Sequence, residues 1–334
     1  MNKIRFGVLG CSRISERSMM PAILNSEYAE LKIIGSRSHE KGKEFCKKFN
    51  CEKHASYEEV VESDDIDAVY ISLPIGLHEE WVLKAAEAGK HILCEKSSTT
   101  SYASALKMVE ASQRNKVRLM EAFMFRFHPQ HKKISELIHN EILGNVFSFN
   151  GSYGFPPVSS TDIRYNASLG GGVLNETGCY PIYASRLVMN EEPLGAICNL
   201  YKDNDKQVDV KGHLSLFFNS DKVAHISFSF EHYYQANYKI WGTKGIAELK
   251  RAYAIPPNMP STIFLNSNDT NSQINVEPSD HFLLMINAFC KEVLGIEGNY
   301  NFENDLLIQA KIMQLARKSN MEKKIAYMDE LSHD

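Results

Sequence analysis

The stretch IRFGVLGCSRIS, residues 4–15, decides the fold of the first part of the chain. Its apolar run, 4–9, has the composition of a buried β-strand, and a helical pattern of apolar residues extends from 15 to 25. A strand, a short turn and a helix in this order form the first unit of an open α/β sheet, in which ligands bind beyond the strand ends.

The turn between this strand and helix carries a variant of the dinucleotide-binding fingerprint. The fingerprint requires small residues for a tight turn, for close approach of a pyrophosphate and for helix–strand packing. Gly10, Ser12 and Ser15 occupy these positions, so serine replaces two of three glycines. The context favours nucleotide binding over a plain tight turn. The residues predicted to contact a cofactor here are Gly10, Cys11, Ser12, Arg13 and Ile14.

Apolar runs and helical patterns keep alternating up to about residue 122. The segments that follow this rule are strands at 31–35, 68–73, 91–94 and 118–121, and helices at 39–49, 79–88 and 103–114. Strict alternation implies parallel strands joined by right-handed crossovers. We therefore predict an α/β fold whose N-terminal Rossmann domain, a doubly wound parallel sheet, spans residues 1–122.

From residue 123 onward the pattern changes to long alternating strands, which are typical of an antiparallel sheet. These strands are predicted at 146–153, 213–218, 224–230, 238–241 and 246–249. Residues 123–334 are thus predicted to form an α/β domain with a large open antiparallel sheet, which binds substrate and mediates oligomerisation.

Helices at 178–189 and 281–293 are expected to cover one face of this second sheet. The other face is expected to expose aromatic side chains and to form an oligomer interface. The aromatic residues assigned to that face are Phe218, Phe228, Phe230, Tyr233 and Tyr234.

The end of the second strand reads Gly35-Ser36-Arg37-Ser38-His39 and bears on the choice of cofactor. An acidic residue here would bind the ribose hydroxyls of NAD, but no acid occurs before Glu40. Arg37 can pair with a 2′-phosphate, while Ser36 and Ser38 can donate hydrogen bonds. The alternative is that Arg37 is a solvated arginine at a strand end, without a role in cofactor binding. The sequence predicts NADP in preference to NAD as the cofactor of the Rossmann domain.

A lysine follows the strand predicted at 91–94, in the stretch LCEKSSTT, residues 93–100. Ligands bind at the strand ends of an open α/β sheet. Lys96, beside Glu95, can hold a sugar hydroxyl, polarise a carbonyl or lower a neighbour's pKa, although most lysines at strand ends are simply solvated. Glu95 and Lys96 are also candidate cofactor contacts. The preceding strand end supplies three more, Leu73, Pro74 and His78, although His78 can instead cap a helix.

A glycine-rich stretch, LGGGVLNETGCYP at residues 169–181, places Tyr180 near the start of a predicted helix, four residues after Glu176. Successive glycines let the backbone turn sharply or approach a ligand closely. A tyrosine near a lysine is a workable general acid, because the ammonium stabilises the phenolate and lowers the pKa of the phenol. The alternative is that Tyr180 is an ordinary packed aromatic residue without a catalytic role.

Composition argues against several classes of function. A net charge of −4 over 334 residues leaves no basic stripe for nucleic acid. Seven cysteines without close pairs argue against disulfides and zinc, and no run suits a membrane span. The chain enters a strand without a signal segment, so we expect a cytoplasmic protein.

His128 and His131 lack a third ligand, so metal binding is not expected. Cys11, Cys94 and Cys179 lack a histidine base, so a cysteine nucleophile is not expected.

Together these segments resemble the glucose–fructose oxidoreductase / inositol dehydrogenase (Gfo/Idh/MocA) superfamily. The matching pieces follow the family's order over residues 7–249: GVLGCSRIS, GSRS, LPIGLHEEWVLKAAEAGKHILCEKS, EAFMFRFHPQ, DIRYNASLGGGVLNETGCYPI and WGTKGIAEL. The GCY and FMFRFHPQ pieces look most like the branch that contains glucose–fructose oxidoreductase, dihydrodiol dehydrogenases and ketoreductases of nucleotide-linked sugars.

The resemblance implies a Rossmann domain followed by a domain whose open sheet is commonly used for dimerisation. It implies that Lys96 matches the active-site lysine and Tyr180 the position of the tyrosine or histidine acid/base. Arg164 matches an arginine close to cofactor and substrate. The substrate contacts implied in this way are Lys96, Arg164, Glu176 and Tyr180.

Three residues depart from the family pattern. Ser97 replaces the proline after the lysine, which loosens the backbone. Ile75 replaces an asparagine and removes a polar cofactor contact. Glu176 replaces an aspartate and is one methylene longer, which can shift the substrate pose.

These residues predict an NADP-dependent oxidoreductase acting on a sugar carbonyl or secondary alcohol, such as that of a nucleotide-linked keto-sugar. Tyr180 would exchange the proton, and Lys96 would stabilise charge and tune the tyrosine. Two alternatives remain: a dihydrodiol-dehydrogenase-like activity on small cyclic diols, and a non-catalytic protein that senses NAD(P). The expected partners are the small substrate and further copies of the chain, in a homodimer or homotetramer.

Overall fold

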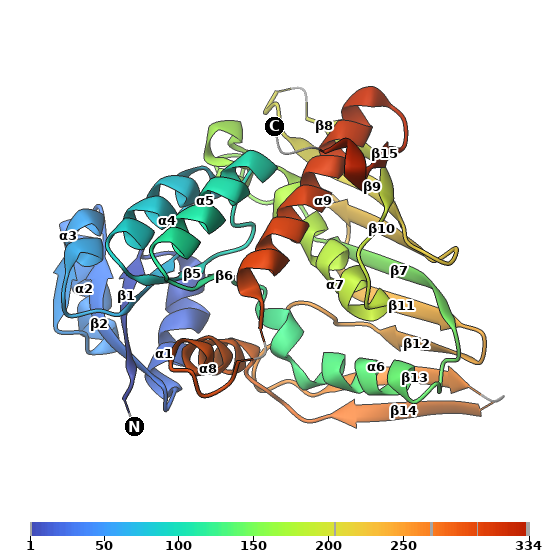
Figure 1. The fold of residues 1–334 in the computed structure, drawn as a ribbon, viewed down its shortest axis with the longest axis horizontal. Coiled ribbons are helices and arrows are strands. Elements are labelled where there is room, and N and C mark those ends of the chain that lie inside the picture. Colours follow the sequence, from blue (N-terminus) through green and yellow to red (C-terminus); the bar gives the residue numbers. More distant parts are fainter. Residues whose placement is uncertain (1, 204, 268–269, 299, 332–334) are drawn as a thin grey trace. The chain divides into compact units, whose positions relative to one another are not determined.

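The computed structural model describes residues 2–203, 205–267, 270–298 and 300–331. The chain forms two compact units (Figure 1). The first comprises Met1–Met124 and His281–Leu307, and the second comprises Phe125–Asp280 and Ile308–Asp334. Within the described residues, no helix is both long and apolar enough to cross a membrane.

The first unit contains a parallel sheet in the order β3-β2-β1-β4-β5-β6, which confirms the predicted doubly wound topology. Its strands are β1 (Ile4–Leu9), β2 (Ala29–Gly35), β3 (Lys53–Ala55), β4 (Ala68–Ile71), β5 (His91–Cys94) and β6 (Leu119–Glu121). Its helices are α1 (Met20–Asn25), α2 (His39–Phe49), α3 (Tyr57–Glu62), α4 (His78–Glu87), α5 (Tyr102–Arg114) and α8 (His281–Val293). The central strands β1 and β4 are almost wholly buried, because helices cover both faces of a parallel sheet.

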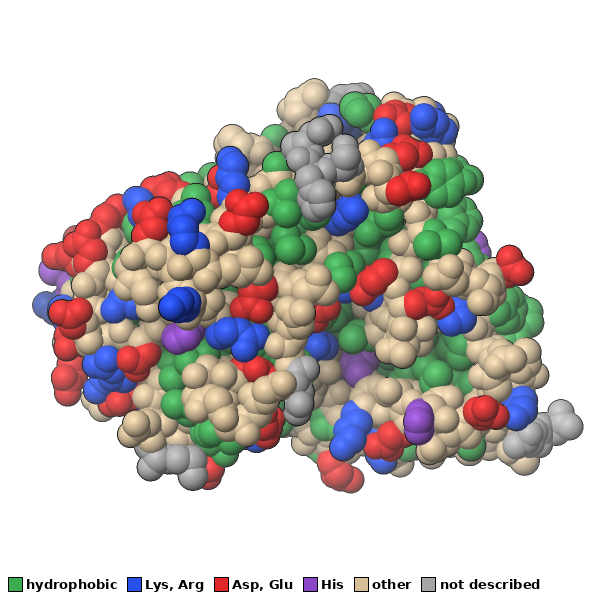
Figure 2. All heavy atoms as spheres, viewed as in Figure 1, with side chains coloured by type: hydrophobic (Ala, Val, Ile, Leu, Met, Phe, Trp, Pro, Cys, Tyr) green, Lys and Arg blue, Asp and Glu red, His purple; other side chains and the backbone are tan. Residues whose placement is uncertain are grey.

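The surface of the first unit carries charges of both signs. On the face shown in Figure 2, acidic and basic side chains are interspersed, and no single-sign stripe is visible there.

Helix α8 packs on the first unit, whereas the sequence-based prediction placed it on the antiparallel sheet. It contacts α1 and β2, and Asn287 Oδ1 accepts a hydrogen bond of 2.6 Å from Ser26. The buried ring of Phe289 lies 6.0 Å from that of Phe6, between centroids. The prediction was wrong because an amphipathic pattern shows that a helix covers a sheet but not which sheet it covers.

The second unit contains a nine-stranded sheet in the order β14-β13-β12-β11-β7-β10-β9-β8-β15. Among its described pairs only β7 and β10 run parallel, so the predicted antiparallel character is confirmed. Its strands are β7 (Val146–Gly154), β8 (Gly195–Lys202), β9 (Asp209–Phe217), β10 (Val223–Ser229), β11 (Gln235–Gly242), β12 (Gly245–Leu249), β13 (Ser261–Ser267), β14 (Thr270–Val276) and β15 (Ala326–Tyr327). Its helices are α6 (Pro129–His139), α7 (Cys179–Met189) and the later part of α9 (Phe302–Glu322).

The aromatic face expected to be open is largely the covered face. Phe218, Phe228 and Phe230 are buried, and of the predicted set only Tyr233 is well exposed. Alternation along a strand separates two faces but does not show which of them the helices cover. The open face instead presents Phe147 and Trp241, whose ring centroids are 5.0 Å apart.

A buried histidine should make the second unit sensitive to acid. His131 Nδ1 lies 2.9 Å from the Tyr238 hydroxyl, and its Nε2 lies 2.9 Å from the Ala252 carbonyl oxygen. Burial lowers the pKa of His131 to about 3. The unfolded chain, with a histidine pKa of about 6.5, takes up this proton as the pH falls, whereas the folded chain does not until about pH 3. Folding stability is therefore lost progressively between these two pH values.

Between pH 7 and pH 5 this difference in proton uptake lowers the free energy of unfolding by roughly 2 kcal/mol. We expect His131→Gln to lose less stability than wild type over this interval, by about that amount, in denaturant titrations at the two pH values. His139→Gln, at the exposed end of the same helix, is the control and should retain the wild-type difference. Equal losses for His131→Gln and wild type would contradict this account.

Candidate active site

A pocket of about 220 Å³ lies in the first unit beyond the carboxyl ends of β1, β2 and β4. This edge of a doubly wound sheet is where ligands bind. The residues that line the pocket are Gly10, Cys11, Ser12, Ser36, Arg37, Ser38, Lys41, Tyr57, Ser72, Leu73 and Pro74. The structure therefore brings eight of the predicted cofactor residues together at one place.

The loop after β1 is shaped by one glycine and three serines. Gly10 has φ +106°, and a Cβ there would lie 3.0 Å from Ser72 Oγ. Ser15 Oγ lies 2.9 Å from Ser12 Oγ and 2.7 Å from Ser72 Oγ. Ser12 Oγ also accepts a hydrogen bond of 3.1 Å from the Ser15 amide. These bonds fix the loop and show how two serines are compatible with the fingerprint.

The end of β2 carries the positive charge of the pocket. Ser38 Oγ caps α2 by accepting a hydrogen bond of 3.3 Å from the Lys41 amide. Lys41 and Arg37 both line the pocket. Tyr57 lies beside Arg37: burial raises the pKa of Tyr57, and the neighbouring guanidinium opposes that rise.

Three lining residues have no counterpart in the sequence-based prediction. Lys41 could have been found, because it lies in the first turn of the helix that follows Arg37. Tyr57 follows β3, a three-residue strand too short to show periodicity. Ser72 follows β4 and gave no signal beyond its place at a strand end.

Two predicted residues, Arg13 and Ile14, lie in the loop after β1 but do not line this pocket. Arg13 is exposed, and Ile14 is half-buried at the start of the helix. The predicted cofactor contacts of both residues remain untested by this geometry.

His78 is fully buried and engaged by backbone. Its Nε2 lies 2.8 Å from the Leu73 carbonyl oxygen, and its Nδ1 lies 3.2 Å from that of Ser97. Burial lowers the pKa of His78. His78 therefore ties the segment after β4 to the segment after β5, and its predicted cofactor contact stays a prediction.

Lys96 lies just beyond β5, and the peptide bond between Lys96 and Ser97 is cis. The Lys96 amide donates a hydrogen bond of 3.2 Å to Glu95 Oε2, and Glu95 Oε1 accepts one of 2.7 Å from the Tyr70 hydroxyl. The Ser98 amide donates to Glu121 Oε1 at 2.7 Å. Two carboxylates thus hold the backbone that presents the lysine.

In the second unit the glycine-rich stretch folds back on the segment that contains Arg164. The Gly171 amide donates to the Asn166 carbonyl at 2.9 Å, and the Gly172 amide donates to that of Arg164 at 3.0 Å. Gly172 has φ +124°, and a Cβ there would overlap the Asp209 carboxylate. Asp209 Oδ2 in turn accepts a hydrogen bond of 2.7 Å from the Leu174 amide. Glycine is required here by both conformation and space.

This folding brings two predicted substrate residues together. Arg164 Nε lies 3.5 Å from Glu176 Oε2, and Arg164 Nη1 lies 3.0 Å from Asp162 Oδ1. Burial lowers the pKa of Arg164, but the two carboxylates outweigh this effect and raise it overall. The guanidinium is therefore held in place by Asp162 and Glu176.

Tyr180 lies in the first turn of α7, after a π-helical turn at Leu174–Gly178. It is 6% exposed, and its ring packs edge-on against that of Tyr153 at a centroid distance of 5.0 Å. The rings of Phe125 and Tyr253 lie 5.7 and 5.8 Å away. Tyr180 therefore lies within a cluster of aromatic rings. Lys96 belongs to the first unit and Tyr180 to the second, so their predicted pairing stays a prediction.

The cysteines of the site are buried. Burial raises the pKa of the Cys11 thiol and raises that of Cys94 well above its ordinary value. A raised pKa disfavours the thiolate, which is the nucleophilic form. This supports the interpretation of these cysteines as lining residues.

Family models match both parts of the chain. The model described as "Oxidoreductase family, NAD-binding Rossmann fold" matches residues 4–123, and that described as "GFO/IDH/MocA C-terminal domain" matches residues 131–248. The dTDP-3,4-didehydro-2,6-dideoxy-alpha-D-glucose 3-reductase of Actinomadura kijaniata is 35% identical over 318 residues, 95% of each chain. The trans-1,2-dihydrobenzene-1,2-diol dehydrogenase of Xenopus laevis is 28% identical over 81% of each chain.

A solved structure with the same fold is that of KijD10, a 3-ketoreductase from Actinomadura kijaniata in complex with NADP and TDP-benzene. It matches with a TM-score of 0.91 at 34% identity, over 95% of this chain and 98% of that one. KijD10 has also been crystallised with a tyrosine replaced by phenylalanine and with a lysine replaced by alanine. Both domain matches and the identity over nearly the full length confirm the resemblance, and we conclude that this chain belongs to the GFO/IDH/MocA oxidoreductase family.

Proposed function

We propose that this protein is an NADP-dependent reductase of a nucleotide-linked keto-sugar, with a dTDP-linked 3-keto-sugar as the first candidate substrate. The observation that carries the proposal is the pair of cations, Arg37 and Lys41, in the pocket of the first unit, in a chain that also presents Tyr180. The 35% identity to a dTDP-keto-sugar 3-reductase over 95% of each chain supports the choice of substrate class.

The pocket fits a dinucleotide that bears a 2′-phosphate. Gly10 has a positive φ, and a Cβ there would press against Ser72 and Leu73, so glycine provides the tight turn that a pyrophosphate-binding loop requires. Arg37 and Lys41 supply positive charge at the end of β2, and none of the described lining residues is an aspartate or glutamate. A carboxylate at this point would favour the ribose hydroxyls of NAD and repel a phosphate.

The roles of the side chains follow from their chemistry. When bound, the nicotinamide supplies a hydride to the carbonyl carbon of the sugar. Tyr180 donates its phenolic proton to the carbonyl oxygen, and Lys96 stabilises the charge that develops there. Arg164, held by Glu176 and Asp162, orients the sugar hydroxyls. These roles are supported by residue type, by the packing of Tyr180 and by the replaced tyrosine and lysine of KijD10.

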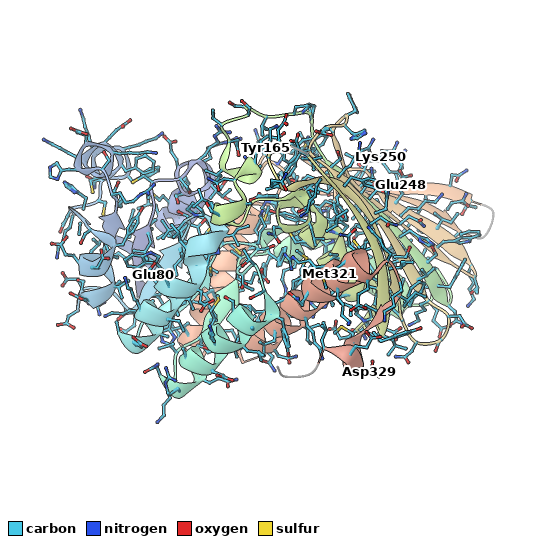
Figure 3. All side chains as sticks on the ribbon, turned by 90° about the horizontal axis from the view of Figure 1, so that it is seen from above. Glu80, Tyr165, Glu248, Lys250, Met321 and Asp329 are labelled. Atoms are coloured by element: carbon cyan, nitrogen blue, oxygen red, sulfur yellow. The ribbon has the colours of Figure 1, made fainter. Side chains whose placement is uncertain are left out.

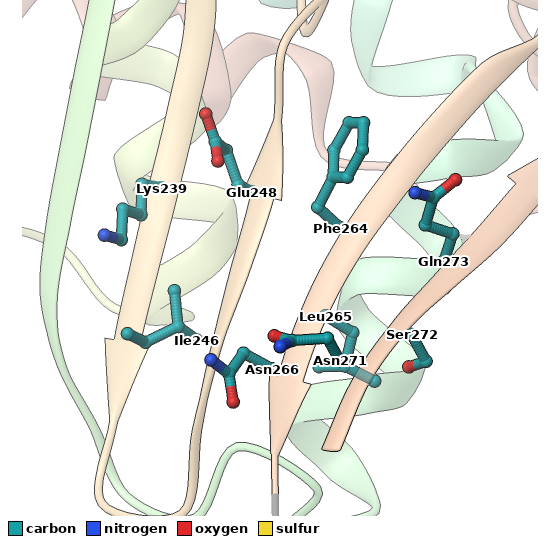
Figure 4. A pocket seen from close by; sticks show the side chains of 9 residues that line it. All are labelled: Lys239, Ile246, Glu248, Phe264, Leu265, Asn266, Asn271, Ser272 and Gln273. Atoms are coloured by element: carbon teal, nitrogen blue, oxygen red, sulfur yellow. The ribbon is translucent and has the colours of Figure 1, made fainter. Parts of the chain in front are cut away.

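The open face of the second sheet is the proposed interface between copies of the chain. A groove of about 650 Å³ runs across β11 to β14, lined by Lys239, Glu248, Phe264 and Gln273 among others (Figure 4). The adjacent rings of Phe147 and Trp241, 40% and 51% exposed, add apolar area that an interface would cover. Sedimentation equilibrium tests this: a homodimer or homotetramer supports the proposal, and a monomer at all concentrations rejects it.

A second candidate function is the oxidation of small cyclic diols, which the similarity to a dihydrodiol dehydrogenase favours. The two candidates differ in the room that the substrate needs, because only a nucleotide-linked sugar carries a base and a diphosphate.

The deciding assay follows NADPH oxidation by the purified protein with a dTDP-linked 3-keto-sugar, in parallel with NADP reduction by a trans-dihydrodiol. Turnover of the keto-sugar alone supports the proposed function. Turnover of the diol alone would establish the second candidate, and turnover of neither, without NADPH binding, would remove both.

A further inference from the structure

One arginine of the second unit, Arg251, has no charged partner among the described residues. Arg251 follows β12, and among the described residues the only hydrogen bond of its side chain runs from Nη1 to Met259 Sδ, at 3.3 Å. A thioether is a weak acceptor. The Nε of Arg251 is buried and has no partner within the part of the chain that the structure describes. A half-buried guanidinium has lost part of its hydration. An anion that accepts hydrogen bonds from it compensates for this loss.

Two tyrosines of the connection between β10 and β11 accompany this arginine. The Arg251 guanidinium carbon lies 5.4 Å from the centroid of the Tyr234 ring. Tyr233, the next residue, is 84% exposed, the highest value among the described large hydrophobic side chains. The half-buried ring of Tyr234 thus contacts the guanidinium, and the next residue presents an exposed ring, which is suited to stack on the planar face of a nucleobase.

The backbone connects both features to Tyr180 within the second unit. Arg251 precedes by two residues Tyr253, whose ring lies 5.8 Å from that of Tyr180. On the other side, Gln235 directly follows Tyr234 and pairs with Gly154. Gly154 follows Tyr153, which packs edge-on against Tyr180. The arginine and the tyrosine pair are therefore joined, through a few residues of backbone, to side chains that pack against the proposed proton donor.

We infer that Arg251 binds the diphosphate of a nucleotide-linked sugar and that Tyr233 stacks on its base, while the sugar extends to Tyr180. This inference rests on the proposed function and names the groups that recognise the nucleotide. The guanidinium offers parallel N–H donors to phosphate oxygens. In a nucleotide sugar the diphosphate is attached to the anomeric carbon of the reacting ring. The cation that binds the diphosphate is therefore expected close to the acid that protonates the carbonyl oxygen of that ring.

The preceding residue provides a matched control. Lys250, labelled in Figure 3, is exposed, and its Nζ lies 4.3 Å from the centroid of the Phe264 ring. Phe264 lines the groove on the open face of the sheet. Lys250→Gln therefore removes one positive charge from the adjacent position without touching the aromatic cluster around Tyr180.

The test is calorimetric titration of dTDP into the NADP-loaded protein. We expect Arg251→Gln to raise the Kd of dTDP roughly tenfold or more, the scale of a lost charge-assisted hydrogen bond, and Lys250→Gln to leave it within about twofold. Arg251→Lys keeps the positive charge but lacks the parallel N–H donors of the guanidinium. It should therefore bind dTDP more tightly than Arg251→Gln and less tightly than wild type. Tyr233→Ala should weaken dTDP binding several-fold but leave the affinity for inorganic pyrophosphate unchanged.

The outcomes separate the inference from the function on which it rests. If Arg251→Gln and Arg251→Lys both bind dTDP as tightly as wild type, Arg251 is not the diphosphate ligand, and the proposed function stands. If the wild-type protein neither binds dTDP nor turns over the keto-sugar, both proposals fail. NADPH affinity is the control for folding, since the cofactor pocket lies in the other unit and should be unchanged in every variant.

Discussion

Replacing Tyr180 by phenylalanine is expected to lower kcat for keto-sugar reduction by at least about a hundredfold, with little change in NADPH affinity. Removal of a general acid costs on the order of 10²–10⁴ in rate, because the carbonyl oxygen must then take its proton from water. The substitution keeps the ring, and the ring makes the packing contacts with Phe125, Tyr153 and Tyr253. The loss should therefore appear in kcat and not in the unfolding midpoint. Steady-state kinetics and thermal unfolding of the same sample measure the two effects.

Tyr253→Phe is the matched control for this experiment. It removes a hydroxyl from the same aromatic cluster, but the Tyr253 hydroxyl donates to the Asn237 carbonyl at 3.3 Å and has no proposed role in proton transfer. We expect its kcat to stay within about threefold of wild type, as for the loss of one modest neutral hydrogen bond. Near-normal turnover in Tyr180→Phe, or equal losses in the two variants, would remove Tyr180 from its proposed role.

The elements predicted best from the sequence are those with a strong local pattern. The strand at Ile4–Leu9 and the helices at His39–Phe49 and His281–Val293 have the expected bounds, since apolar periodicity is a property of the segment itself. The choice of sheet by the last of these helices was wrong, because only tertiary contacts such as Asn287 with Ser26 decide it. The same reason explains the buried Phe228 and Phe230, which alternate as expected on the face opposite to the one assigned.

The residues of the candidate site likewise differ in whether the sequence alone could place them. Gly10 and Arg37 could be placed because a parallel strand delivers the residues that follow it to one edge of the sheet. The hydrogen bonding of His78 could not be predicted, since a position at a strand end does not show that a backbone carbonyl oxygen lies within hydrogen-bond distance of each ring nitrogen. Arg251 gave no signal at all, because its lack of a carboxylate partner among the described residues exists only in the folded chain.

Replacing Arg37 by alanine is expected to weaken NADPH binding about 10- to 100-fold and NADH binding by no more than about threefold. A hydrogen bond to a charged group contributes about 1.5–3 kcal/mol, and each 1.4 kcal/mol changes the Kd tenfold. Only NADPH carries the 2′-phosphate, so the ratio of the two affinities isolates that group from the rest of the dinucleotide. Nicotinamide fluorescence titrations with both cofactors measure this ratio directly.

Lys43→Ala is the control for charge, because Lys43 is exposed on α2, two residues beyond Lys41, and does not line the pocket. It should change neither affinity by more than about twofold, as expected for a solvated surface charge. Lys41→Ala, the second cation of the pocket, should lower NADPH affinity in the same direction as Arg37→Ala but by less, since an ammonium lacks the bidentate fork. Equal losses of NADPH and NADH in Arg37→Ala would place its guanidinium on the adenine, which both cofactors share. The preference for NADPH over NADH would then have to come from Lys41, and the ratio of the two affinities measured for Lys41→Ala would show it.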